Sequence, residues 1–136
     1  IHAGWRGTVK RIVEKTISKM RDEYNTNPED CISLIGPSIS KERFEVGDEV
    51  YDMFKNEKFN MKDIASLFPI ANNQGKHKWH IDLWAANKLQ LIETGIKEIN
   101  IEIAGICTYD NADTYFSARK LGVSSGRIIT GIMITK

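Results

Sequence analysis

The sequence has little cysteine and almost no net charge, and each shortage excludes a class of protein. Its two cysteines, Cys31 and Cys107, lie far apart without C-x-x-C spacing, so neither a disulfide framework nor a zinc ribbon is indicated. A reducing cytoplasm is the expected location. Nineteen Lys and Arg against 18 Asp and Glu leave a formal charge of +1. The chain as a whole therefore has no electrostatic footprint for nucleic acid or an acidic membrane surface.

Long apolar runs are also missing. No stretch approaches the roughly 18 apolar residues that span a bilayer, so no membrane partner is expected. A hydrophobic fraction of 41% with 27% charged residues is ordinary for a globular protein. We therefore expect one soluble domain over residues 1–136. Because "IHAGW" looks like the end of a strand entering a turn, with no initiating Met, we also expect the N-terminal portion of this domain to be missing.

Two stretches have the apolar spacing of amphipathic helices. The first begins at Thr8 and ends before "NTNPED"; the second covers "HIDLWAANKLQLIETG", with Asp82 near its positive end and Gly95 as a C-terminal cap. In each, apolar residues recur at offsets 0, 3, 4, 8 and 11, which places them on one face. These residues are Val9, Ile12, Val13, Ile17 and Met20 in the first helix, and Ile81, Trp84, Ala85, Leu89 and Ile92 in the second.

Three short apolar stretches predict β-strands. "CISLIGPSI" indicates a buried strand followed by a loop, "KEINIEIAGI" alternates with Ile99, Ile101 and Ile103 on one face, and "RIITGIMIT" indicates a strand that is at least partly buried. Elsewhere, "RFEVGDEVYDMFKN" predicts an extended piece and a short helix, and "TYFSARKLG" a turn or short helix. Residues 56–78 look irregular. The expected fold class is α+β (mixed α/β), with a mixed β-sheet packed with helices.

The opening stretch "HAGWRGT" is the first candidate site. Gly4 and Gly7 allow a ligand to approach the backbone, Arg6 offers a planar fork of donors suited to phosphate or carboxylate, and His2 suits a metal ligand or general base. The start of the first helix would add free N–H groups and a positive dipole end. The alternative is a glycine turn in which His2 is hydrogen-bonded in the core and Trp5 serves packing.

The "CTYDN" loop is the second candidate. Cys107 and Asp110 would follow a strand and lie at one sheet edge, where Cys107 and His2 could form a nucleophilic pair. The alternative is a buried cysteine acting as a small hydrophobe. His77 and His80 have a chelating spacing, but an exposed, solvated pair fits their lysine-rich surroundings better.

Taken in order, these motifs resemble one family. "HAGWRGT", "IGPSIS" with "FEVGDEV", "IDLWAANKLQL", "CTY" with "YFSARK", and "GRI" are similar to blocks of the YfiH-like family, known as multicopper polyphenol oxidase or laccase-domain proteins and as purine nucleoside phosphorylases. The resemblance covers essentially the whole chain and implies a CNF1/YfiH-like fold. It departs at Ala118 and Lys120, where the family's "SYRR" is "SARK".

The resemblance implies a single metal site and a reaction on nucleosides. The family binds one metal through two upstream motifs, "HG" and "ADC", and the histidine of "HAGWRG", here His2. A Cys and two His suit zinc at least as well as copper. The implied activity joins inorganic phosphate to C1′ of adenosine or inosine, giving free base and ribose 1-phosphate, with possible adenosine deaminase and methylthioadenosine phosphorylase activity. From the chemistry of the two loops rather than from the resemblance, we expect His2 and Arg6 to be catalytic and Gly4, Gly7, Cys107, Asp110 and Arg119 to bind the substrate.

Two other functions stay open from the sequence. One is a copper-dependent polyphenol oxidase, although multicopper oxidation needs many more histidines than the three in this chain. The other is an inactive half-domain that serves as a binding protein or scaffold. The oligomeric state and the preferred nucleoside are not fixed by the sequence.

Overall fold

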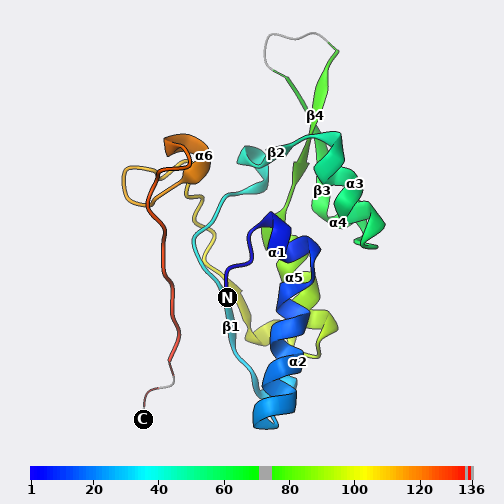
Figure 1. Cartoon of the computed structure of the whole chain (residues 1–136), viewed down its shortest axis with the longest axis vertical. Coiled ribbons are helices and arrows are strands. Elements are labelled where there is room, and N and C mark those ends of the chain that lie inside the picture. The colour runs from blue at the N-terminus through cyan, green and yellow to red at the C-terminus, as the bar shows by residue number, and fades with distance from the viewer. Residues whose placement is uncertain (71–74, 134, 136) are drawn as a thin grey trace.

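The computed structural model describes residues 1–70, 75–133 and 135. In chain order, its helices and strands are α1 (Trp5–Val9), α2 (Ile12–Tyr24), β1 (Ser33–Ile35), β2 (Glu45–Val46), α3 (Asp48–Asn56), α4 (Met61–Ile64), β3 (Ala65–Pro69), β4 (His77–Ile81), α5 (Leu83–Glu93), β5 (Ile101–Ile103) and α6 (Ala118–Leu121) (Figure 1).

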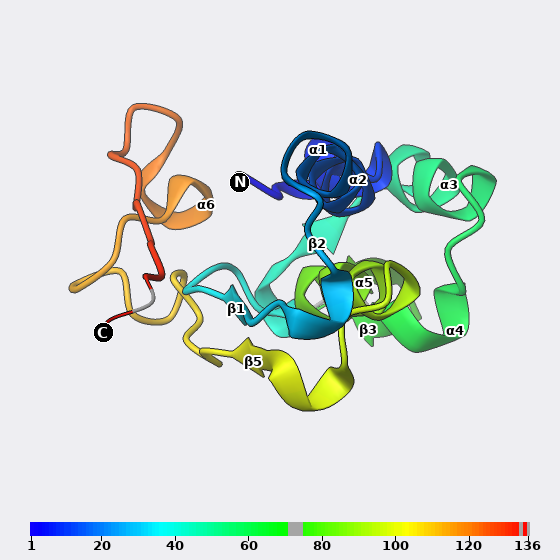
Figure 2. The same ribbon diagram turned by 90° about the horizontal axis from the view of Figure 1, so that it is seen from below.

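Parallel and antiparallel strands both occur, in two separate sheets. β1 and β5 form a parallel pair in which Ser33 lies opposite Ile101 and Ile35 opposite Ile103. β2, β4 and β3 form an antiparallel sheet with β4 in the middle. Helix α5 packs between α2 and the β1–β5 pair (Figure 2). The predicted mixed α/β class is confirmed.

Two clusters of buried side chains hold these parts together. The larger lies around the antiparallel sheet and includes Phe54, Ile64 and Ile81, each completely buried. The smaller lies between α2 and α5 and contains Val13, Ile17, Leu91 and Ile96. The predicted extended piece and short helix are confirmed as β2 and α3. In α3, Val50 and Phe54 are buried, whereas Met53 is 47% exposed.

The first predicted helix is in fact two helices. Arg11 separates α1 from α2 in the left-handed conformation, with φ of 57°, which costs a non-glycine residue about 1 kcal/mol. Its guanidinium lies 2.8 Å from Glu14, 3.0 Å from Glu93 and over the Phe59 ring. These contacts offset the cost of the break. Apolar spacing continues across Arg11, so the periodicity alone predicted one helix.

The second predicted helix is confirmed as α5, with both of its caps. Asp82 Oδ1 accepts a hydrogen bond from the Ala85 N–H at 2.9 Å, and Gly95 follows the helix with φ of 97°. Its buried face differs from the prediction: Ile92 is 37% exposed. The buried residues of the helix are Leu83, Ala86, Asn87, Gln90 and Leu91. Polar Asn87 and Gln90 face inward because both bond to Thr8.

The middle of the chain was predicted to be irregular, and this was wrong. Asn60 caps α4, and β3 and β4 then form an antiparallel hairpin that pairs Ala65 with Ile81 and Pro69 with His77. The hairpin projects from the rest of the molecule (Figure 1). Each residue of β3 pairs with a residue of β4 that lies at least eight positions later in the sequence. Local composition does not reveal such a partner. Part of the predicted "NNQGKHK" loop, residues 71–74, lies outside the described residues.

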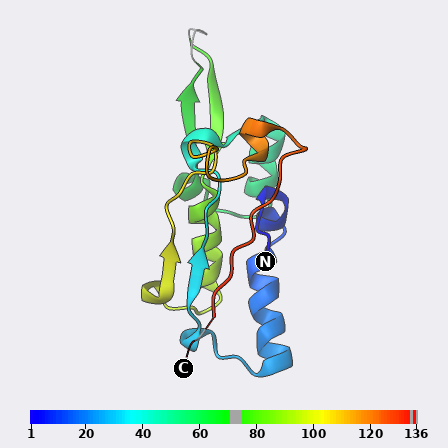
Figure 3. The ribbon, with the colours of Figure 1, turned by 90° about the vertical axis from the view of Figure 1, so that its left-hand side faces the viewer.

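The predicted C-terminal strand is also wrong within the described residues. Residues 127–133 belong to no strand there, and Ile129, Ile132 and Met133 are 96%, 65% and 80% exposed. A strand needs a partner backbone, and this segment pairs with none of the described strands. It runs past the N-terminus and along the side of β1 (Figure 3).

The other two strand predictions hold in part. β1 and β5 form as expected, but Leu34 in β1 is 43% exposed, so this strand is not buried. Ile99 is 91% exposed because a 3₁₀ turn over Glu98–Asn100 precedes β5. Among the described residues, no helix has the length and apolar character to cross a membrane.

Candidate functional site

In the opening turn, the His2 ring lies beside Gly4. A Cβ atom built on Gly4 would lie 2.8 Å from His2 Nε2, closer than real Cβ contacts allow. A Cβ on Gly7 would lie 3.1 Å from the His2 carbonyl oxygen and 3.3 Å from Ile12 Cγ2. Both glycines therefore leave room for His2, one for its ring and the other for its backbone. His2 itself is exposed.

A buried polar network fixes this turn to α5. Thr8 is completely buried, and its Oγ1 lies 3.0 Å from the carbonyl oxygen of Ala3. Asn87 Nδ2 donates to Thr8 Oγ1 at 3.1 Å, and Gln90 Nε2 donates to the Thr8 carbonyl at 3.1 Å. Among the described residues, Gln90 Oε1 is buried without a partner. These bonds fix the backbone that carries His2.

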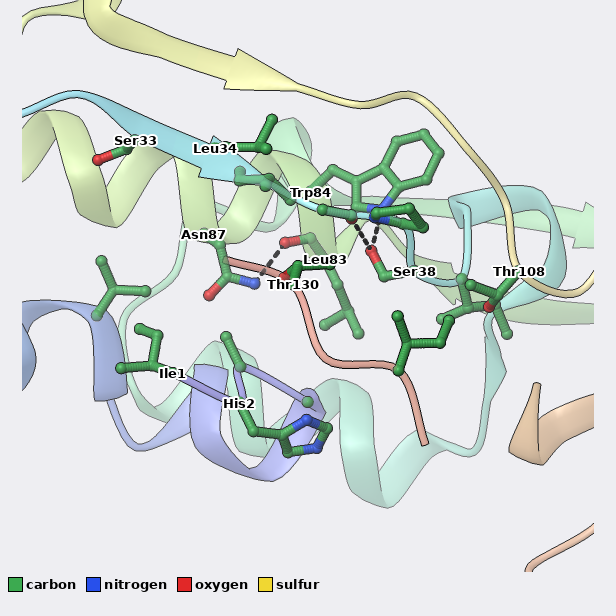
Figure 4. Close-up of a pocket in the computed structure, with 18 of the residues that line it drawn as sticks. Ile1, His2, Ser33, Leu34, Ser38, Leu83, Trp84, Asn87, Thr108 and Thr130 are labelled. Atoms are coloured by element: carbon green, nitrogen blue, oxygen red, sulfur yellow. Dashed lines mark hydrogen bonds between the residues drawn. The ribbon is translucent and has the colours of Figure 1, made fainter. Parts of the chain in front are cut away.

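The turn lines a large groove. The groove has a volume of about 1480 Å³ and lies between residues 1–5, α2, β1, α5 and the chain after residue 126. Figure 4 shows Ile1 and His2 on one side and Leu34 and Trp84 on the other. His2, Gly4 and Arg119, three of the predicted site residues, line it together.

Arg119 is held at the groove by α6 and β2. Its Nη1 donates to the Glu45 carbonyl oxygen at 3.0 Å, and its guanidinium lies 5.3 Å from the centre of the Phe44 ring. Ser38, Thr108 and Asn87 add polar groups to the same lining. The Ser38 hydroxyl accepts a hydrogen bond from the Trp84 indole at 2.6 Å.

Arg6 and Gly7 do not line the groove. The Arg6 guanidinium is exposed and lies 4.2 Å from the centre of the Trp5 ring. Helix α1 has only five residues, so few peptide dipoles add at its N-terminus. The predicted helix start at Thr8 is wrong, since α1 begins at Trp5. An anion bound at this short helix would gain less from the helix dipole than the prediction of one long helix assumed.

Cys107 and Asp110 are engaged within the chain. Cys107 is 8% exposed, and its Sγ accepts a hydrogen bond from the Ser40 N–H at 3.5 Å. Asp110 lies 2.7 Å from Arg43 Nε. In the neighbouring turn, backbone and Ser40 hydrogen bonds lower the pKa of the Glu42 carboxyl group below its ordinary value. The arrangement matches the alternative that treats Cys107 as a buried packing residue.

His80 is not part of an exposed pair. It is 8% exposed, its Nδ1 lies 2.9 Å from the Lys41 carbonyl oxygen, and its ring packs on Phe68 with centres 4.5 Å apart. His77 is exposed at the start of β4. The interpretation of two solvated histidines before a helix is therefore wrong for His80, because both residues lie in a strand.

The residues present do not make a complete metal site. Within the described ranges, no three His, Cys, Asp or Glu side chains gather closely enough to hold a metal ion. A catalytic zinc takes three protein ligands and keeps one open position. His2 can supply one imidazole, and the described part of the chain does not supply the others.

Comparison with known proteins assigns the family. The family model described as "Multi-copper polyphenol oxidoreductase laccase" matches residues 1–135. The chain belongs to this laccase family. It is 50% identical over all 136 residues to a protein of Bacteroides thetaiotaomicron named purine nucleoside phosphorylase, and 42% identical over 131 residues to adenosine deaminase RL5 from an unknown prokaryotic organism.

Solved structures of the laccase family share the fold. The crystal structure of the Bacillus licheniformis hypothetical protein YfiH matches with a TM-score of 0.74 at 27% identity, over 88% of this chain and 43% of that one. The match to the Bacteroides thetaiotaomicron protein covers 100% of this chain, and the match to adenosine deaminase RL5 covers 96% of it. Each match covers 48% of the relative's own length. The chain thus spans about half the length of the curated relatives it matches.

Sequence reasoning missed the Thr8, Asn87 and Gln90 network. The available signal was the position of Asn87 and Gln90, three residues apart within a predicted amphipathic helix. Amide side chains at that spacing on a helix share one face. A polar pair facing the core indicates a buried partner, and Thr8 of the opening motif is that partner.

Proposed function

We propose that this chain forms part of a purine nucleoside phosphorylase. The observation that carries the proposal is the 50% identity, over the full 136 residues, to the Bacteroides thetaiotaomicron protein of that name. The reaction joins a phosphate oxygen to C1′ of adenosine or inosine. The C1′–N9 bond breaks, its electron pair leaves with the purine, and a proton completes the free base. The second product is ribose 1-phosphate.

Within this proposal, His2 and the two arginines have separate roles. His2 lines the groove, where Gly4 leaves room for its ring, and it faces the substrate as a metal ligand or a general base. Arg119 lines the same groove and is a candidate contact to phosphate, as is Arg6 beside the turn. Gly7 acts through the His2 backbone. Because Cys107 and Asp110 bond within the chain, we assign them to holding the loop rather than to the substrate.

A metal site at the groove would need protein ligands in addition to His2. The resemblance implies one zinc, with copper as the alternative, but the described residues bring no three His, Cys, Asp or Glu side chains together. No step of the reaction is therefore assigned to a metal. A zinc site with three protein ligands that includes His2 would need at least one ligand from outside the described ranges.

Adenosine deamination is the second candidate function. It is favoured by the 42% identity to the protein named adenosine deaminase RL5. Deamination replaces the purine amino group with oxygen from water, releases ammonia and leaves the glycosidic bond intact. The two reactions are therefore separated by their products and by their need for phosphate. A cytoplasmic location suits both, since nucleosides and phosphate are available there.

The test uses a fusion that restores the unmatched half of the Bacteroides thetaiotaomicron relative to this chain, in the order in which the relative carries the two halves. The fusion is incubated with adenosine or inosine, with and without phosphate, and the products are separated by chromatography. We expect adenine and hypoxanthine to appear only with phosphate, in equal amounts with ribose 1-phosphate. Phosphate-independent conversion of adenosine to inosine as the only reaction would favour deamination. Oxygen uptake with a phenol and no nucleoside conversion would favour the polyphenol oxidase, and a folded fusion without any activity would favour a scaffold.

A further inference from the structure

We propose that Thr8 is a positioning residue for His2, and that its hydroxyl group sets where the His2 imidazole lies. The effect on the reaction rate rests on the proposed function, whereas the place of the imidazole is a property of the fold alone. Because Thr8 is completely buried, it acts through the backbone of Ala3 and not by contact with a substrate.

The first three residues have few ties to the rest of the molecule. Ile1 is 76% exposed and His2 is also exposed, so packing does little to fix them. Within the described part of the chain, one hydrogen bond reaches these residues, from Thr8 Oγ1 to the Ala3 carbonyl oxygen at 3.0 Å. Trp5, two residues further on, already packs against the larger buried cluster. The position of the His2 backbone therefore depends strongly on this one bond.

The Thr8 hydroxyl donates to Ala3 because the Asn87 amide donates to the hydroxyl. Asn87 Nδ2 has two hydrogens and lies 2.7 Å from the Leu83 carbonyl oxygen (Figure 4) and 3.1 Å from Thr8 Oγ1, so it donates one to each. The single hydroxyl hydrogen is then free for another acceptor. The Ala3 carbonyl oxygen is the nearest at 3.0 Å, while the Gly4 carbonyl oxygen and Asn87 Oδ1 each lie at 3.2 Å. The Gly4 carbonyl also accepts the Thr8 N–H already, at 2.9 Å.

Helix α5 holds Thr8 at a second point, its carbonyl oxygen. Gln90 Nε2 donates to this oxygen at 3.1 Å, and the Arg11 N–H donates to it at 3.0 Å. Gln90 is completely buried, and among the described residues its Oε1 has no partner, which carries a desolvation cost. A buried polar group without a partner calls for an explanation. The hold on Thr8, and through it on His2, supplies one.

The test compares variants of the fusion that keep or remove the Thr8 hydroxyl. Thr8→Val removes it with little change of shape, and Thr8→Ser keeps it. Thr94→Val is the matched control, because Thr94 Oγ1 donates at 2.7 Å to the Leu91 carbonyl oxygen, within the end of α5 and away from the groove. The imidazole signals are followed by NMR, and the His2 signal is assigned from its absence in His2→Ala.

We expect the His2 signal to move in Thr8→Val and to stay in place in Thr8→Ser and Thr94→Val. The kcat of phosphate-dependent base release should fall about 10-fold in Thr8→Val, a part of the roughly 100-fold that a misplacement of about 1 Å can cost. KM should stay unchanged, because the bond places the reacting group and does not bind the substrate. Thr8→Ser should restore kcat.

Gln90→Met provides a second variant in case Thr8→Val does not fold. This change removes the donor to the Thr8 carbonyl oxygen, which keeps the Arg11 N–H as a partner. It also removes the unpartnered Oε1, so the fold should tolerate it well. We expect the His2 signal to move in this variant too, by less than in Thr8→Val.

Three results would overturn the proposal. The first is an unmoved His2 signal in folded Thr8→Val, or in Gln90→Met if Thr8→Val is unfolded. The second is an equal movement in Thr94→Val, which would make it a general effect of losing a helix hydroxyl. The third is a Thr8→Ser variant whose signal moves as far as that of Thr8→Val. If the fusion releases no base but the His2 signal moves as expected, the phosphorylase proposal fails and the role of Thr8 is supported.

Discussion

Replacing Asn87 with leucine is expected to lower the free energy of unfolding by about 3 kcal/mol. The change removes the donors to Thr8 Oγ1 and to the Leu83 carbonyl oxygen, which Asn87 Nδ2 approaches to 3.1 and 2.7 Å. Both Asn87 and Thr8 are buried, so no water replaces the lost partner. Urea denaturation followed by circular dichroism measures the difference. Asn56→Leu, an exposed position on α3, is the matched control and should change stability by less than about 0.5 kcal/mol.

A double-mutant cycle with Thr8→Val separates the hydrogen bond from packing. Removing both partners costs less than removing one, because an unpaired buried polar group carries its own desolvation penalty. We expect the double variant to be more stable than the sum of the single effects implies, by about 1 kcal/mol. Strictly additive effects would contradict a direct interaction between Thr8 and Asn87.

Gly4→Ala is expected to reduce kcat/KM for phosphate-dependent base release in the fusion by about 100-fold, as misplacement of a catalytic group by about 1 Å does. Gly4 has φ of −64° and ψ of 167°, so alanine fits its backbone without strain. The new Cβ would lie 2.8 Å from His2 Nε2, and the imidazole must move. The melting temperature should change little, because His2 is exposed.

Gly47→Ala is the matched control for this change. Gly47 also precedes a helix, with φ of −79° and ψ of 168°, and its added Cβ would also meet a side chain. That side chain is Glu49, which is exposed and free to rotate away. We expect full activity from Gly47→Ala. Equal losses in the two variants would show that a methyl group before a helix, rather than the position of His2, controls activity.

Local signals in the sequence predicted the parts of the fold that depend on local interactions. The Asp82 cap, Gly95 and the apolar spacing of α5 are all determined within one stretch of chain, and the structure confirms them. The break at Arg11 depends instead on Glu93 and Phe59, which lie far along the sequence. The β3–β4 hairpin and the C-terminal segment likewise depend on which backbone is available for pairing. Apolar spacing carries no information about such partners.

For the candidate site, the opening motif predicted a role for this turn, but the sequence did not show which contacts fix the turn to α5. The residues His2, Gly4 and Gly7 were recognised by type, and the structure adds that both glycines make room for the histidine. Cys107 and Asp110 were predicted as pocket residues because they follow a strand, yet each has a partner inside the chain. Thr8 and Asn87 were overlooked because a threonine in a helix and an amide on another helix show no relation until the fold brings them together.

The role of His2 is the central claim, and one comparison tests it most directly. Ribose 1-phosphate formation from inosine and phosphate is measured for the fusion, for His2→Ala and for His77→Ala, which changes an exposed histidine on β4. We expect His2→Ala to lose about 100-fold or more of the rate, in the range of a missing acid–base group, and His77→Ala to keep it. Undiminished ribose 1-phosphate formation by a folded His2→Ala variant would contradict the account.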